Sequence, residues 1–157
     1  MNFSLKPHQL VAHWVPGFLL LMVIAVLHPS ASEGVKALLP HSDALSGFVL
    51  AVLAFAIGQL LDAVRDLCEN IWDRWDKVDW DFFFEAKPEQ IEKLDGSYFT
   101  YYVFNSNLVL PLLYFSLGRL ISGHYAQFAL ALAADAFFIV DARCLRKEIA
   151  RHTRARR

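Results

Sequence analysis

Residues 44–76 read ALSGFVLAVLAFAIGQLLDAVRDLCENIWDRWD, and this stretch decides what fold to expect. Its first half is apolar for about the 20 residues that a helix needs to cross a bilayer core. Its second half is rich in acids. These acids recur every three or four residues, at Asp62, Asp66, Glu69, Asp73 and Asp76. Because that spacing places them on one helical stripe, we expect a single helix that crosses a membrane and continues to about residue 80.

Three other segments share the apolar character of this first half. With it they form four expected spans, at residues 10–27, 44–64, 98–121 and 125–142. Pro16 and Pro111 lie inside two of them, which membrane helices tolerate when neighbouring groups satisfy the freed carbonyls. The sequence therefore predicts an all-α fold: one integral membrane four-helix bundle, with the second and third helices extended into a cytoplasmic hairpin over residues 65–97.

The composition of the 157 residues agrees with a membrane protein and excludes other classes. Hydrophobic residues make up 56%, above the usual 45–50% of soluble domains, and charged residues make up only 20%. Thirteen phenylalanines exclude a disordered chain, and two cysteines exclude a disulfide scaffold. The net charge of −1 argues against a nucleic-acid partner.

Lysine and arginine at the ends of the spans set the expected orientation, because cytoplasmic loops carry an excess of them. The tail at residues 143–157 holds seven basic residues, and the connection between the second and third spans holds four more. The other two connections hold Lys36 and Arg119. We therefore expect both termini in the cytoplasm, in a membrane of the bacterial inner-membrane type.

The cytoplasmic hairpin is unusually acidic and aromatic. Eleven of the chain's 16 acids lie between Asp62 and Asp95. Pro88 predicts the first turn of a new helix, which would run into the third span with an interruption at Gly96. The acids form either a solvated face or a docking surface. For docking we expect contacts from Trp72, Trp75, Trp80, Arg146, Lys147 and Arg151. The basic tail can complement the acids of its own chain or of a neighbour, or bind anionic lipid headgroups.

Each expected span brings polar groups to the level of the inner leaflet. Candidate catalytic groups, should the protein be an enzyme, are His13, Asp62, Arg65, Asp66, Asp135 and Asp141. Candidate ligand-binding groups are Arg65, Asn105, Asn107 and Arg143. Charged groups at this depth normally face the bundle interior and have partners. Three interpretations stay open: helix–helix contacts only, an ion or proton path, or an embedded enzyme acting on a phosphate-bearing lipid.

No known catalytic or nucleotide-binding motif is present, and the sequence identifies no cofactor. We expect no metal; the carboxylates Asp62, Asp66 and Glu69 are only weak candidates, because any acidic helix produces such spacing. Small residues four apart, at Gly47 and Ala51, Ala54 and Gly58, and Ala129 and Ala133, permit close helix packing within a chain or between chains.

The leading hypothesis is therefore a homo-oligomeric membrane component in contact with lipids, which docks a cytoplasmic protein and acts as an anchor, sensor or effector. The alternatives are the embedded enzyme and a small ion or proton pore, so enzymatic activity stays open.

Overall fold

The computed structural model describes residues 7–154 apart from positions 41, 75 and 80, and this part of the chain is helical with no strand. The predicted all-α class is confirmed. The elements are α1 (Pro7–Leu27), α2 (Pro29–Leu38), α3 (Asp43–Trp72), α4 (Phe82–Glu85), α5 (Pro88–Leu94), the π-helical turn η1 (Asp95–Phe99), α6 (Thr100–Ile121) and α7 (Tyr125–Arg154).

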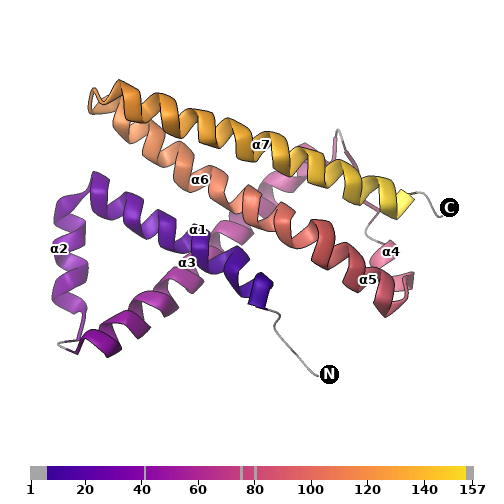
Figure 1. Cartoon of the computed structure of the whole chain (residues 1–157), viewed down its shortest axis with the longest axis horizontal. Coiled ribbons are helices and arrows are strands. Elements are labelled where there is room, and N and C mark those ends of the chain that lie inside the picture. The colour runs from indigo at the N-terminus through magenta and orange to yellow at the C-terminus, as the bar shows by residue number, and fades with distance from the viewer. Residues whose placement is uncertain (1–6, 41, 75, 80, 155–157) are drawn as a thin grey trace.

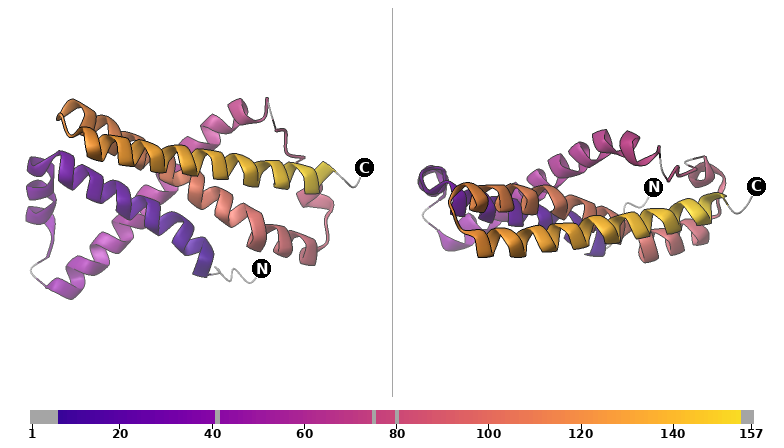
Figure 2. Two further views of the ribbon diagram at one scale, coloured as in Figure 1. Left: turned by 45° about the horizontal axis from the view of Figure 1, so that its top comes forward. Right: turned by 90° about the horizontal axis from the view of Figure 1, so that it is seen from above.

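Two helix pairs make up the architecture (Figure 1). α6 and α7 form a long antiparallel hairpin, and they stay side by side in every view (Figure 2). α1 packs on α6 and on α3. α3 runs diagonally across α1 and α6. The short α2 joins the far ends of α1 and α3. The beginning of α1, the end of α7 and the small helices α4 and α5 all lie at the opposite end of the molecule.

Local sequence explains where several elements begin and end. Pro29 and Pro88 occupy the first turns of α2 and α5, where a missing backbone N–H costs nothing. Gly123 has a φ of 74° and closes the turn between α6 and α7, a conformation that side chains disfavour. The interruption expected at Gly96 is the π-helical turn Asp95–Phe99.

The long helix of residues 44–76 stops earlier than expected. α3 ends at Trp72 rather than near residue 80, and the described residues that follow, 73, 74 and 76–79, leave the helix. We call residues 73, 74 and 76–79 the strap, because they continue along α7. The physical reason is packing: Val78 is only 2% exposed and joins a hydrophobic cluster with Ile149 and Ala150 of α7, which a straight helix would not reach.

Two helical stretches are long and apolar enough to cross a membrane, Leu10–Leu27 and Asp43–Glu69. Only 22% and 17% of these stretches is buried inside the protein. α6 and α7 form over the other two expected spans, but Asn105, Asn107 and Asp135 interrupt their apolar sequence.

The main hydrophobic cluster lies at one end of the molecule rather than along the apolar helices. Its buried members include Val78, Leu94, Tyr102, Ile149 and Ala150. Along α1, α3, α6 and α7, by contrast, large apolar side chains point outward. Examples are Phe18, Phe48, Leu60, Leu130 and Phe137, each at least half exposed.

Two glycines let α1 and α3 cross in backbone contact. A Cβ atom at Gly17 would lie 1.8 Å from the Ala54 carbonyl oxygen, and one at Gly58 would lie 2.1 Å from the His13 carbonyl oxygen. The Ala54 and Gly58 pair therefore packs within the chain. Gly47, Ala51, Ala129 and Ala133 are exposed.

Replacing Gly58 by Ala is expected to lower the free energy of unfolding by about 2 kcal/mol or more, because the added methyl group forces two backbones apart. Gly47→Ala is the matched control, since nothing lies within 4 Å of a Cβ there. Its expected effect has the opposite sign, a gain of about 0.5–1 kcal/mol, because a helical glycine is removed. Unfolding in mixed detergent micelles measures both; a Gly58→Ala protein as stable as wild type would contradict this crossing.

Candidate functional site

Arg146 is the centre of the polar site. This side chain of α7 is only 1% exposed, although it carries a full charge. It donates from Nη2 to Asp73 at 2.5 Å, from Nη1 to the Tyr102 hydroxyl at 2.8 Å and from Nε to the Asp76 carbonyl at 3.3 Å. Glu69 lies 3.5 Å away, and the Tyr102 ring lies beneath the guanidinium. Arg146 thus joins α3, the strap, α6 and α7.

The protonation of Arg146 follows from these partners. Burial acts to lower the pKa of its guanidinium, but Tyr102, Glu69 and Asp73 outweigh burial and leave the pKa above its ordinary value. The side chain therefore stays cationic and cannot act as a base. Its role is to neutralise carboxylates that would otherwise be buried without a partner.

Arg65 of α3 is the centre of a second cluster of this kind, one helical turn before Glu69. Its guanidinium lies 2.6 Å from Asp62, 2.7 Å from Asp66 and 3.7 Å from Glu69. Tyr102 links the two arginines, because its hydroxyl donates to Glu69 at 3.2 Å and its ring lies 5.8 Å from Arg65. We call this connected set, Arg65, Arg146, Tyr102 and the carboxylates Asp62, Asp66, Glu69 and Asp73, the charge layer.

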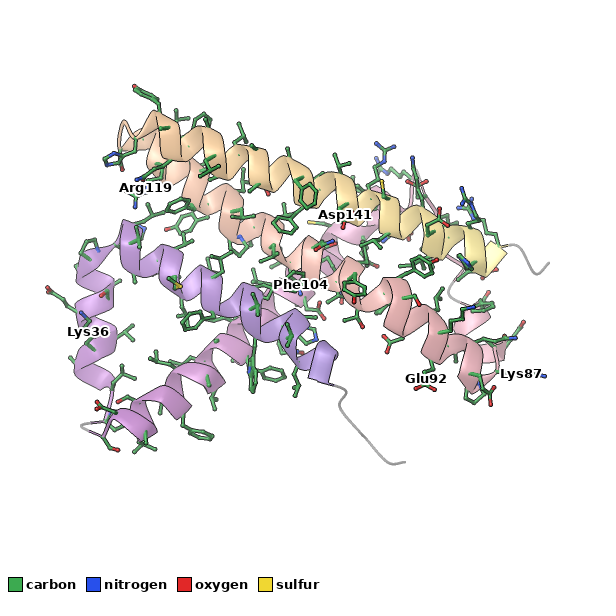
Figure 3. All side chains as sticks on the ribbon, in the orientation of Figure 1. Lys36, Lys87, Glu92, Phe104, Arg119 and Asp141 are labelled. Atoms are coloured by element: carbon green, nitrogen blue, oxygen red, sulfur yellow. The ribbon has the colours of Figure 1, made fainter. Side chains whose placement is uncertain are left out.

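Two asparagines of α6 extend the charge layer. Asn107 is 1% exposed and donates to Asp62 of α3 at 3.2 Å. Asn105 donates to Asp141 of α7 at 2.5 Å. Asp141 lies midway along the α6–α7 hairpin, close to where α3 passes (Figure 3). The amide groups thus bind carboxylates of the neighbouring helices within the chain.

The strap is attached to α7 at several further points. Arg143 lies 3.8 Å from Asp76, the backbone N–H of Asp79 donates to Thr153 at 3.3 Å, and Arg154 donates to the Lys77 carbonyl. The basic tail therefore pairs with the acids of its own chain. The sequence left three partners open for the basic tail: acids of its own chain, acids of a neighbouring chain and anionic lipid headgroups. The structure contains the pairing within the chain.

A cavity of about 190 Å³ opens beside the charge layer. It is lined by Ala12, His13, Asp62, Arg65, Asp95, Phe99, Thr100 and Val103. The His13 ring contacts Phe55 edge-on, and its Nδ1 atom is buried without a hydrogen bond from the described residues. His13, Asp62 and Arg65 thus line one cavity, and the two charged groups already bind each other.

Asp135 lies apart from the charge layer. It is 3% exposed on α7, and its Oδ1 atom has no hydrogen-bond partner among the described residues. The distance along the helix from Asp141 is about 9 Å, at 1.5 Å per residue. The structure therefore gives Asp135 no place in a common site with His13.

The predicted partner-binding residues fall into three groups. Lys147 and Arg151 are exposed, as docking requires. Arg146 is buried, so its prediction as a surface contact needs correction: the acids of α3 and the strap already occupy its guanidinium. Trp72 is half-buried beside Cys68, while Trp75 and Trp80 lie outside the described residues.

The predicted metal candidates do not form a metal site in the described part of the chain. Asp62, Asp66 and Glu69 converge on Arg65, whose positive charge occupies the position a cation would take. No group of three or more His, Cys, Asp or Glu side chains there can hold a metal ion.

The sequence reasoning missed several residues that build this region. Ile149, Ala150 and Thr153 are buried with Arg146 on one face of α7, and their spacing of three or four residues is a helical signal that could have identified it. Tyr102 gave no such signal, because Tyr101 beside it is the same residue type and is 57% exposed.

Comparison with known proteins gives no relative: no family model, curated protein or solved structure matches this chain.

Replacing Arg146 by Met is expected to destabilise the protein by about 3 kcal/mol, because Glu69, which is 15% exposed, loses its nearer cation and Asp73 loses its partner. Arg151→Met is the matched control: Arg151 lies on the same helix, but its pair with Glu148 is exposed, so a change of no more than about 1 kcal/mol is expected. Denaturant unfolding measures both variants. Equal losses would show that Arg146 is an ordinary surface residue.

Proposed function

We propose that the protein is a non-catalytic integral membrane component with four spans, which docks a cytoplasmic protein at the end formed by α4 and α5. The observation that carries this proposal is the charge layer. Arg65 and Arg146 are bound to four carboxylates of the same chain, so these groups hold helices together and none of them stands ready for chemistry.

The distribution of apolar surface supports the membrane placement. A soluble protein would bury its most apolar helices, whereas the apolar stretches of α1 and α3 are mostly exposed. The exposed apolar side chains on α6 and α7 extend the same surface around the molecule. Most of the hydrophobic cluster lies outside these two stretches, and only Ala12 of α1 belongs to both.

The end formed by α4 and α5 is the part best placed for docking. Asp81, Glu85 and Glu89 are exposed there, next to a hollow of about 190 Å³ lined by Phe82, Gln90 and Thr153. Because α3, the strap and α7 are joined by the charge layer, this end is held rigidly relative to the spans. A docking surface fixed in this way suits an anchor or an effector, and an oligomer would present one such surface on each copy.

The native cysteines test the orientation. Cys144 is exposed just beyond the fourth expected span, so a membrane-impermeant maleimide should label it from the cytoplasmic side only. A Cys68→Ser background isolates this signal, and Ser122→Cys in the α6–α7 turn is the matched outer control. With Cys144 removed, Ser122→Cys should be labelled from the opposite side only. Labelling of both positions from the same side would contradict four spans.

Docking at α4 and α5 is tested by charge reversal. Glu85→Lys with Glu89→Lys should abolish site-specific cross-linking between this end and a cytoplasmic protein in native membranes, because the docking surface changes sign. The matched control is Glu33→Lys on α2, which is exposed at the opposite end and should leave the cross-linked species unchanged. Identical cross-links in both variants would refute docking at this end.

One observation favours the embedded enzyme as a second candidate: the cavity beside the charge layer is lined by His13, whose Nδ1 atom has no hydrogen-bond partner in the described part of the chain. A neutral imidazole can serve as a general base. Turnover of phospholipids by the reconstituted chain, abolished by His13→Ala, would favour the enzyme over the anchor.

A further inference from the structure

The region around the strap and the end of α7 has an unexpected surface charge. Its sequence is rich in acids, yet the acids of α3 and the strap point inward. Glu69, Asp73 and Asp76 bind Arg146 and Arg143, and their side chains are 15%, 32% and 17% exposed. The bases of the same region are exposed. They are Arg74, Lys77, Arg143, Lys147, Arg151 and Arg154, and we call them the basic collar.

Helical spacing explains the basic collar on α7. Arg143, Lys147, Arg151 and Arg154 follow one another at intervals of four, four and three residues, which places them on one face. The neighbouring face of α7 carries Arg146 and the residues of the hydrophobic cluster. Nitrogen-tipped side chains accordingly gather on the outer side of the last turns of α7 (Figure 3). Glu148 and Asp66 pair with Arg151 and Arg65, and the exposed acids Asp81 and Glu85 line the hollow beside Thr153, next to Arg154.

The basic collar lies level with the places where α3 and α7 leave their apolar stretches. The apolar stretch of α3 ends at Glu69, and Glu69 lies 3.5 Å from Arg146, so residue 146 marks the same depth on α7. Arg143 and Lys147 are within one turn of that depth. Arg154 lies about 12 Å beyond it, at 1.5 Å per residue, which is close to one Debye length.

We infer that the basic collar binds the headgroups of anionic phospholipids in the cytoplasmic leaflet. This inference rests on the proposed membrane placement and adds a ligand class to it. Depth favours lipid over an acidic protein, because the collar lies where α3 and α7 leave their apolar stretches. Charge favours it as well, because the surface proposed to dock a protein, at α4 and α5, carries the exposed acids Asp81, Glu85 and Glu89. Each basic residue near the surface should raise the affinity for an anionic headgroup about fivefold.

The test measures lipid binding to the full chain in detergent. The chain is equilibrated with equal amounts of phosphatidylglycerol and phosphatidylcholine of the same acyl composition, and native mass spectrometry counts the bound molecules of each. Wild type should retain phosphatidylglycerol about tenfold or more over phosphatidylcholine. Arg74→Gln with Lys147→Gln should lower this ratio to near one, because two exposed bases that each contribute about fivefold are lost.

The matched control is Lys87→Gln with Lys93→Gln. It removes the same charge from exposed positions on and before α5, which are not part of the basic collar (Figure 3 labels Lys87), and should leave the ratio unchanged. Helix content by circular dichroism must match wild type for both variants; if the collar variant unfolds, Lys147→Gln alone should still lower the ratio about fivefold.

Three results would overturn the inference. They are a wild-type protein that binds phosphatidylglycerol and phosphatidylcholine equally, a collar variant with an unchanged ratio, and a control variant whose ratio falls as much as that of the collar variant. The last result would mean that any positive charge on the protein attracts the lipid. Loss of protein cross-links in the collar variant, with the lipid ratio unchanged, would assign the collar to a protein and also overturn it. A chain that stays soluble and monomeric without detergent would instead refute the membrane proposal itself, so the two failures are distinguishable.

Discussion

The structure depends on a charge that is buried at the point where four segments meet. Taking a guanidinium out of water costs several kcal/mol unless carboxylates and hydrogen bonds surround it. Arg146 meets that requirement only when α3, the strap and α6 all contact α7 at once, because its partners come from each of them. A displacement of any one segment would remove part of the set that surrounds this buried charge, so the charge layer favours one relative position of the segments.

The two ends of the molecule are stabilised by different interactions. At the end near α4 and α5, apolar side chains are buried against one another, as in a soluble domain. Along the apolar helices, backbones approach closely at Gly17 and Gly58 while large side chains face outward. Lipid is the environment in which that second arrangement is favourable, because small residues and polar contacts, rather than hydrophobic burial, hold membrane helices together. The charge layer lies between these two regions.

Much of this organisation follows from the sequence. Apolar runs, acid spacing and prolines predicted the helices, the extension of α3 beyond its apolar half and the beginning of α5 at Pro88. The basic tail was recognised as a complement to the acids. The pattern of charges alone did not show which tail residue turns inward, because Arg146 and Lys147 are adjacent bases; the helical spacing of Arg146 with Ile149 and Thr153 is the signal that distinguishes them. It also could not show that Gly17 and Gly58 meet, since they lie on different helices, or that Val78 draws the chain out of α3.

The central claim is that Arg146 and Asp73 act as one unit that joins α7 to the strap. A double-mutant cycle with Arg146→Met and Asp73→Asn, followed by the free energy of unfolding in detergent, tests it most directly. The account predicts strong non-additivity: the double variant loses less stability than the sum of the single variants, with a coupling of at least about 1 kcal/mol. Losses that add to within about 0.5 kcal/mol, as for residues that do not touch, would contradict it.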